Sequence, residues 1–157
     1  MRSYAPNTPQ AMARFIAMFI ITDGRMDPEE LESLEKFMVY ELLGLGRKQF
    51  MQVLTEYCDD ISDEADEADG TIHLIDPARL ETLIDDITDP EKRILTCALA
   101  MDIAKSMGDI SEPDITLLRY IMSKWDITLD DIAAHFAPRA NAKAAHAQSP
   151  ITQNALE

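Results

Sequence analysis

The sequence predicts an all-α fold, a single compact domain of about seven helices, and three observations support this. Apolar residues recur every three or four positions along most of the chain, the spacing of amphipathic helices. Only five of the 157 residues are glycine, and no run alternates apolar with polar residues for long enough to form a sheet. The length suits one domain, and a hydrophobic content of 46% suffices for its core.

Helix starts are marked by a capping residue followed by proline. The pairs are Thr8-Pro9, Asp27-Pro28, Asp76-Pro77 and Asp89-Pro90. The side-chain oxygen accepts a hydrogen bond from a first-turn N–H group, and proline lacks an N–H that would have no partner there. Ser111 with Asp114, and Asp27 with Glu30, have the spacing of a capping box.

These starts predict helices over residues 9–22, 28–43, 47–59, 77–87, 90–107, 112–125 and 129–136. The predicted core faces of the first three consist of Met12, Phe15, Ile16 and Phe19, then Leu31, Leu34, Phe37 and Met38, then Phe50, Val53, Leu54 and Tyr57. Cys58 and Cys97 are expected to be buried free thiols. Residues 1–137 form the predicted domain, and 138–157, which lack apolar periodicity, a mobile tail.

The chain is strongly acidic, with 29 acidic against 14 basic residues and a net charge of -15. Such a surface repels a phosphate backbone, so we expect no nucleic-acid ligand and instead a protein partner with a basic surface. The alternative is that the charge serves only solubility. The longest apolar run, Ala11 to Ile21, contains Arg14 and is shorter than the ~20 residues of a membrane span. We therefore expect no integral membrane segment and a cytoplasmic location.

The domain contains an internal repeat with an offset of 84 residues, in which 21–31 aligns with 105–115. The matched pairs are Gly24 with Gly108, Met26 with Ile110, Glu30 with Asp114, Leu31 with Ile115, Leu34 with Leu118, and Phe37 with Ile121. Each unit reads as a helix, a glycine turn, an apolar residue that plugs the turn, and a capped helix. The glycines are predicted to adopt a positive φ. The fold is thus built on two related helix–turn–helix units.

This motif resembles the TerB-like family of tellurite-resistance proteins over residues 9–136. The first unit matches the family pattern at Asp23, Gly24, Met26, Asp27 and Glu30. The second departs from it, because Met107 stands where the family usually has Asp and Asp114 replaces Glu. The resemblance implies an all-α interaction module in tellurite or chemical-stress response, with acidic clusters proposed to bind a divalent metal and no demonstrated catalytic activity.

The candidate metal ligands are the acids at the two turns. They are Asp23, Asp27 and Glu30 in the first unit, and Asp109 and Asp114, with Asp102 nearby, in the second. Carboxylates around a glycine turn suit hard cations such as Ca²⁺ or Mg²⁺. The alternative is that these acids only cap helices. In favour of capping, Phe19 and Ile21 occupy the places where an EF-hand loop needs its first two acids.

A second acidic region spans residues 59–70. Glu67, Asp69, Gly70 and Asp76 follow part of an EF-hand pattern, but Ala65 stands at its first ligand position. The favoured interpretation is therefore a solvated run of charges.

Catalytic motifs are absent from the sequence, which has only three histidines, His73, His135 and His146. We therefore expect the protein not to be an enzyme. Two alternatives stay open: a metal-dependent phosphoester hydrolase, and a structural adaptor that binds no ligand.

Overall fold

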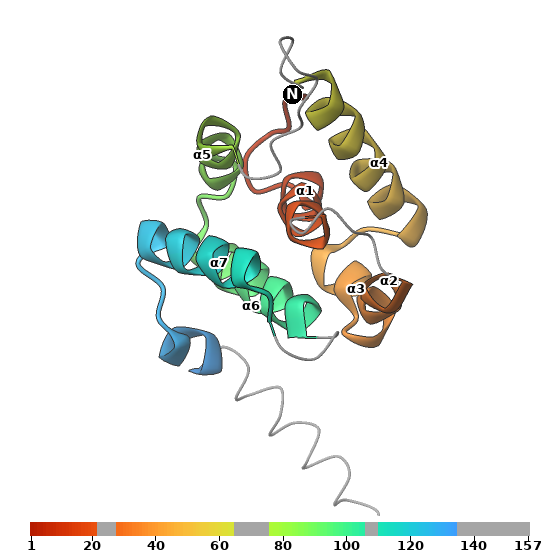
Figure 1. Ribbon diagram of the computed structural model, residues 1–157. Coiled ribbons are helices and arrows are strands. Elements are labelled where there is room, and N and C mark those ends of the chain that lie inside the picture. Colours follow the sequence, from red (N-terminus) through yellow and green to blue (C-terminus); the bar gives the residue numbers. More distant parts are fainter. Residues whose placement is uncertain (22–27, 65–75, 106–109, 135–157) are drawn as a thin grey trace, which may run out of the picture.

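The computed structural model describes residues 1–21, 28–64, 76–105 and 110–134, and within these ranges it contains helices and no strand (Figure 1). The helices are α1 (Pro9–Ile20), α2 (Pro28–Lys36), α3 (Val39–Leu43), α4 (Arg47–Asp63), α5 (Pro77–Asp85), α6 (Pro90–Lys105) and α7 (Glu112–Trp125). Residues 129–134 are also helical. The predicted all-α fold is confirmed. No helix in the described ranges is long and apolar enough to cross a membrane.

Helix α1 lies at the centre of the molecule and contacts α3, α4, α5 and α6 (Figure 1). Every residue from Ala11 to Ile21 is buried, including Arg14. The predicted apolar face is therefore only part of what this helix buries. A helix that is apolar around its whole circumference needs neighbours on all sides, and here they come from both halves of the chain.

The second predicted helix, over 28–43, is in fact two helices. Met38 separates α2 from α3 and adopts a left-handed conformation with φ of 57°. Its side chain is 48% exposed, so its predicted burial is wrong. A continuous helix would place Met38 on the same face as the buried Leu34. The break rotates the chain so that Val39, Tyr40 and Leu43 enter the core instead.

The predicted helix starts are confirmed where the structure describes them. The Thr8 side chain accepts a hydrogen bond from the Ala11 amide at 3.3 Å, and the Asp76 carboxylate accepts one from the Arg79 amide at 2.9 Å. Asp89 accepts one from the Glu91 amide at 2.9 Å. These caps satisfy N–H groups that have no partner within their own helices.

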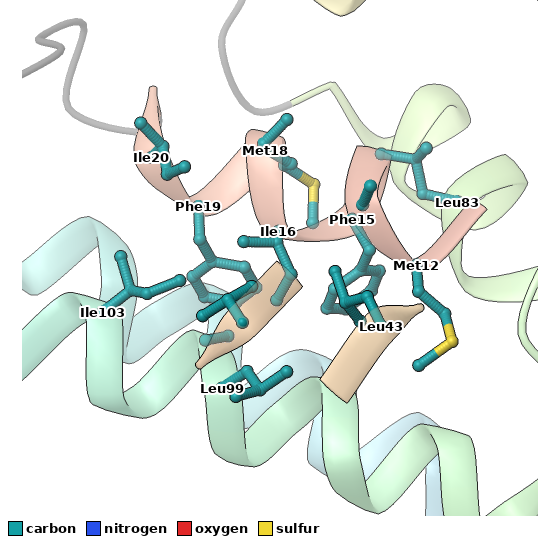
Figure 2. Close-up of a cluster of buried hydrophobic side chains, with 14 of the residues drawn as sticks. Met12, Phe15, Ile16, Met18, Phe19, Ile20, Leu43, Leu83, Leu99 and Ile103 are labelled. Atoms are coloured by element: carbon teal, nitrogen blue, oxygen red, sulfur yellow. The ribbon is translucent and has the colours of Figure 1, made fainter. Parts of the chain in front are cut away.

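The two helix–turn–helix units meet through their first helices, α1 and α6. Figure 2 shows Phe15 and Phe19 pointing from α1 toward α6, from which Leu99 and Ile103 point back. These are equivalent positions of the repeat, 84 residues apart, and all four side chains are at most 3% exposed. The repeat thus provides the two halves of one interface. The predicted positive φ at Gly24 and Gly108 concerns residues outside the described ranges.

Other predicted core residues differ in their burial. Phe50, Val53, Leu54 and Tyr57 are buried as predicted, whereas Leu31 and Phe37 are half-buried. Trp125 is buried and stacks on Phe15, with the ring centroids 5.2 Å apart. Both cysteines are free, Cys97 is buried, and Cys58 is only half-buried. The predicted tail, 138–157, lies outside the described residues.

Candidate functional site

Most of the predicted metal ligands fall where the structure gives no description. Asp23, Asp27 and Asp109 lie outside the described ranges. Glu30 belongs to the first turns of α2, but its side chain is likewise not described. Of the five predicted ligands, Asp114 alone has a described environment.

Asp114 takes part in a helix cap. It is the third residue of α7 and is 8% exposed. The Ser111 hydroxyl accepts a hydrogen bond from the Asp114 amide at 3.3 Å and donates one to Asp114 Oδ2 at 2.7 Å. The capping-box spacing predicted for this pair therefore brings the two side chains together. One carboxylate oxygen of Asp114 is already engaged, which favours the capping interpretation for this residue.

Elsewhere in the described part of the chain, no group of three His, Cys, Asp or Glu side chains is placed to hold a metal ion. The three histidines, His73, His135 and His146, fall outside those ranges.

The described part of the acidic region, residues 59–64, is not simply a solvated run, and residues 65–70 lie outside the described ranges. Helix α4 continues to Asp63 instead of ending at Asp59. Asp60 is only 8% exposed and forms an ion pair with the Arg2 guanidinium at 3.0 Å. Glu64 accepts a hydrogen bond from Arg79 Nε, also at 3.0 Å. The predicted solvated run is wrong for Asp60, because this residue faces the N-terminal segment, and correct for Asp59 and Asp63, which are exposed.

A buried arginine lies at the centre of a polar network that the sequence prediction missed. Arg14, on α1, is 1% exposed and pairs with Asp86, which follows α5. Its guanidinium also donates to the Arg2 carbonyl oxygen and lies 4.5 Å from the centroid of the Tyr4 ring. A signal for this network was present in the sequence, since an arginine inside an apolar run requires a buried anionic partner.

Tyr4 and Asn7 extend this network across the N-terminal segment. The Tyr4 hydroxyl donates to Glu56 Oε2 at 3.0 Å. Burial, helped by this carboxylate, raises the pKa of Tyr4 to about 12. Asn7 Oδ1 accepts hydrogen bonds from the Thr88 and Asp89 amides at 2.8 and 2.9 Å. Residues 2–7 thereby connect α4 to the loop between α5 and α6.

Two apolar depressions flank α7. The larger, with a volume of about 380 Å³, is lined by Met101, Ile110, Ile115, Leu118, Arg119, Met122 and Leu129. The smaller, of about 180 Å³, is lined by Pro77, Leu80, Thr116, Leu117 and Tyr120. Arg119 is the one charged side chain among these lining residues.

The rim of the smaller depression carries a polar cluster. The Tyr120 hydroxyl donates to Glu81, and Lys124 Nζ lies 3.2 Å from Glu81 Oε1. Hydrogen bonds from Tyr120 and Lys124 lower the pKa of Glu81, and the hydrogen bond to Glu81 raises the pKa of Tyr120. Tyr120 is 40% exposed, whereas Trp125 on the same helix is buried.

No protein-family model, curated protein or solved structure matches this chain.

Proposed function

We propose that this chain is a non-catalytic interaction module of the TerB-like kind, which acts in the response to tellurite or related chemical stress. In this proposal an acidic surface docks onto a basic protein partner. A divalent cation, Ca²⁺ or Mg²⁺, binds at the first helix–turn–helix turn and modulates the docking.

The observation that carries the proposal is the excess of acidic over basic residues, 29 against 14, which the burial of charged side chains does not offset. Arg14 and Arg79 are 1% and 6% exposed, and each pairs with an acid of the same chain. Burial removes these two positive charges from the surface and, at Asp60 and Asp114, two negative ones, so it leaves the net charge of -15 unbalanced. The remaining surface attracts a basic partner over distances of about a screening length, ~10 Å at 0.1 M salt.

Helix α2 supplies an acidic face next to the first turn. Glu29, Glu32 and Glu35 are all exposed and recur at intervals of three residues, so they lie along neighbouring turns of one side. Arg47 contacts Glu35 at 2.9 Å, but both side chains are more than half exposed. Exposed pairs of this kind contribute little to stability, so Glu35 remains accessible to a partner.

Docking is tested by capturing partners from the native cell over a salt series. Retention is expected to fall as the salt concentration rises from about 0.05 M to about 0.5 M, because screening weakens contacts between exposed charges. A Glu29→Gln, Glu32→Gln variant should retain less partner at low salt. Retention that ignores both salt and these substitutions would contradict the acidic docking surface.

Metal binding is tested by calorimetric titration of the full chain with Ca²⁺, Mg²⁺ and Mn²⁺. The heat of binding should disappear in an Asp23→Asn, Glu30→Gln variant and persist in the matched control Asp59→Asn, whose exposed carboxylate lies elsewhere. No heat at millimolar metal would remove the cation from the proposal, and an unchanged affinity in the double variant would place the cation at other residues.

The stress role is tested by deleting the gene in the native cell and measuring survival in tellurite. The deletion strain should be more sensitive, and the wild-type chain should restore survival. A strain that survives as well as the parent in tellurite and in oxidants would contradict this part of the proposal.

A further inference from the structure

The larger depression beside α7 is an apolar groove on the surface of the second helix–turn–helix unit. Its base is Leu118, which is 6% exposed, and one wall is Leu129, which is 62% exposed. Met101 of α6 and Ile115 and Met122 of α7 are half-buried between them. Leu129 is the one exposed apolar side chain of this lining, and the half-buried side chains beside it extend the apolar surface into one contiguous patch. Contiguous apolar patches of this kind are typical of binding surfaces.

The groove has the form that a helix can occupy. Ile115, Leu118 and Met122 follow one another at intervals of three and four residues, so they form one apolar stripe over two turns of α7. A partner helix with apolar residues at the same spacing can pack its own stripe against them. The two methionines have unbranched, flexible side chains that adapt to the shape of such a partner.

The charges beside the groove determine which helix would bind. Asp102 follows Met101 in the chain, Asp130 follows Leu129, and Asp126 is the C-cap of α7, four residues after Met122. Asp126 and Asp130 are exposed. Arg119, also exposed, is the one basic residue in the groove lining, and its aliphatic stem can form part of the apolar wall. Exposed acids therefore lie close in the chain to the Leu129 wall, and the net charge of -15 adds to their attraction for a basic partner.

We propose that this groove is the docking site for a basic amphipathic helix of a partner protein, with apolar residues in the groove and Lys or Arg beside the acids. This inference rests on the proposed function, since it assigns the basic partner of the acidic module to one surface. A helix with acidic flanks would meet Asp126 and Asp130 and be repelled.

The probe for the test is a labelled synthetic peptide of about 18 residues, or about five turns, with leucines along one side and lysines elsewhere. Its binding to the full chain is measured by fluorescence anisotropy at low salt. Two peptides serve as controls, one of the same composition in an order that is not amphipathic and one with glutamates in place of lysines. The lysine peptide in amphipathic order should bind more tightly than either control.

Variants of the chain locate the site. Leu129→Ser should weaken binding of the lysine peptide about tenfold, because an apolar anchor is lost. The matched control Met38→Ser changes an apolar side chain that is also exposed but lies outside the groove, and it should have no effect. Asp130→Lys should weaken binding about two- to fivefold, and Arg119→Glu should strengthen it by a similar factor.

The outcomes separate this inference from the proposed function. If the lysine peptide binds in a salt-dependent manner but Leu129→Ser has no effect, the groove is wrong and the acidic docking surface stands. If only the glutamate peptide binds, both the basic partner and the groove assignment are wrong. If Leu129→Ser instead abolishes self-association in sedimentation while the peptide does not bind, the groove is occupied by a second copy and the inference is overturned.

Discussion

At the scale of single residues, Arg14 shows how a charge is accommodated inside an apolar helix. An isolated ion transferred from water into a protein interior costs several kcal/mol even after relaxation. Arg14 avoids that isolation through an ion pair with Asp86, a hydrogen bond to the Arg2 carbonyl oxygen and the face of the Tyr4 ring. These partners come from the N-terminal segment and from the end of α5, so Arg14 joins three parts of the chain.

Replacing Arg14 with methionine is therefore expected to lower the free energy of unfolding by about 3 kcal/mol, the lower end of the range for breaking a buried pair. The lower end applies because the Asp86 side chain is 17% exposed and keeps some contact with water. Urea unfolding measures the change. In Arg14→Met, Asp86→Asn the stranded carboxylate is gone, so the double variant should be more stable than Arg14→Met alone. If the loss of stability in the double variant equals the sum of the losses in Arg14→Met and in Asp86→Asn, the two side chains do not interact.

The two thiols are expected to differ in reactivity. Burial raises the pKa of Cys97 to about 12, so this thiol stays protonated at neutral pH and is also shielded from reagents. Burial and the nearby Asp59 raise the pKa of Cys58 as well, but Cys58 is only half-buried. With a thiol reagent at pH 8, Cys58 should react slowly and Cys97 only after unfolding. A Cys58→Ser variant isolates Cys97, and its rapid reaction in the folded protein would contradict this assignment.

At the scale of helices and turns, the junction between α2 and α3 stores conformational strain. A residue with a Cβ atom in the left-handed region costs about 1–2 kcal/mol, and Met38 is such a residue. Met38→Gly should remove this cost. The greater conformational entropy of the unfolded chain opposes the gain by about 0.5–1 kcal/mol of free energy. A net stabilisation of about 0.5 kcal/mol is expected in thermal unfolding.

Met38→Ala provides the control for that prediction. It removes the same side-chain atoms beyond Cβ but keeps Cβ itself, so the strain persists and no stabilisation should follow. If Met38→Gly destabilises the protein as much as Met38→Ala does, packing of the half-exposed side chain outweighs the backbone strain.

The sequence predicts the helices well because their signals are local. Thr8, Asp76, Asp89 and Ser111 each lie within three residues of the amides that they cap, so spacing alone identifies them. The break at Met38 is missed because it depends on how the side chains after it pack against the rest of the core, and the local sequence does not show this packing. Tertiary demands of this kind override a helical pattern that continues through residue 43.

The polar network around Arg14 and the groove beside α7 are less predictable from sequence for a related reason. The partner of Arg14 is 72 residues away in the chain, and that of Arg2 is 58 residues away. An apolar run with one arginine indicates that a partner exists but not which of 29 acids it is. The groove beside α7 combines residues of three helical segments, and no local motif marks their meeting.

At the scale of the whole molecule, buried tyrosines limit stability in alkali. Burial raises the pKa of Tyr57 from 10.0 to about 12, with a smaller contribution from Glu64. The unfolded chain therefore loses the phenol proton at a lower pH than the folded chain does. The stability linked to this group is complete below pH 10 and is lost as the pH rises toward 12, to an extent of at most about 3 kcal/mol.

Urea unfolding at several pH values between 9 and 12 checks this linkage, since each midpoint reports the stability at that pH. Tyr57→Phe removes the titrating hydroxyl and should decrease the loss of stability over this range. Tyr120→Phe is the comparison, because Tyr120 is 40% exposed and its pKa is raised chiefly by the hydrogen bond to Glu81 instead of by burial. Equal effects of the two substitutions would show that burial of Tyr57 is not the cause.

The net charge of -15 acts on the molecule as a whole. Like charges on a compact surface repel one another more than they do in an expanded chain, so the charge opposes folding. Raising NaCl from about 10 mM to about 150 mM shortens the screening length from about 30 Å to about 8 Å, which weakens this repulsion. The melting temperature should therefore rise with salt over this interval.

The Asp59→Asn, Asp63→Asn variant tests whether repulsion is the cause of that rise. Both side chains are exposed near the end of α4, so the substitutions reduce the charge without disturbing the core. This variant should melt higher than the parent at low salt and respond less to added NaCl. The buried pair of Arg14 with Asp86 is screened little by salt, so it should not offset the rise. A melting temperature that falls with salt would mean that exposed ion pairs, such as Arg47 with Glu35, outweigh the general repulsion.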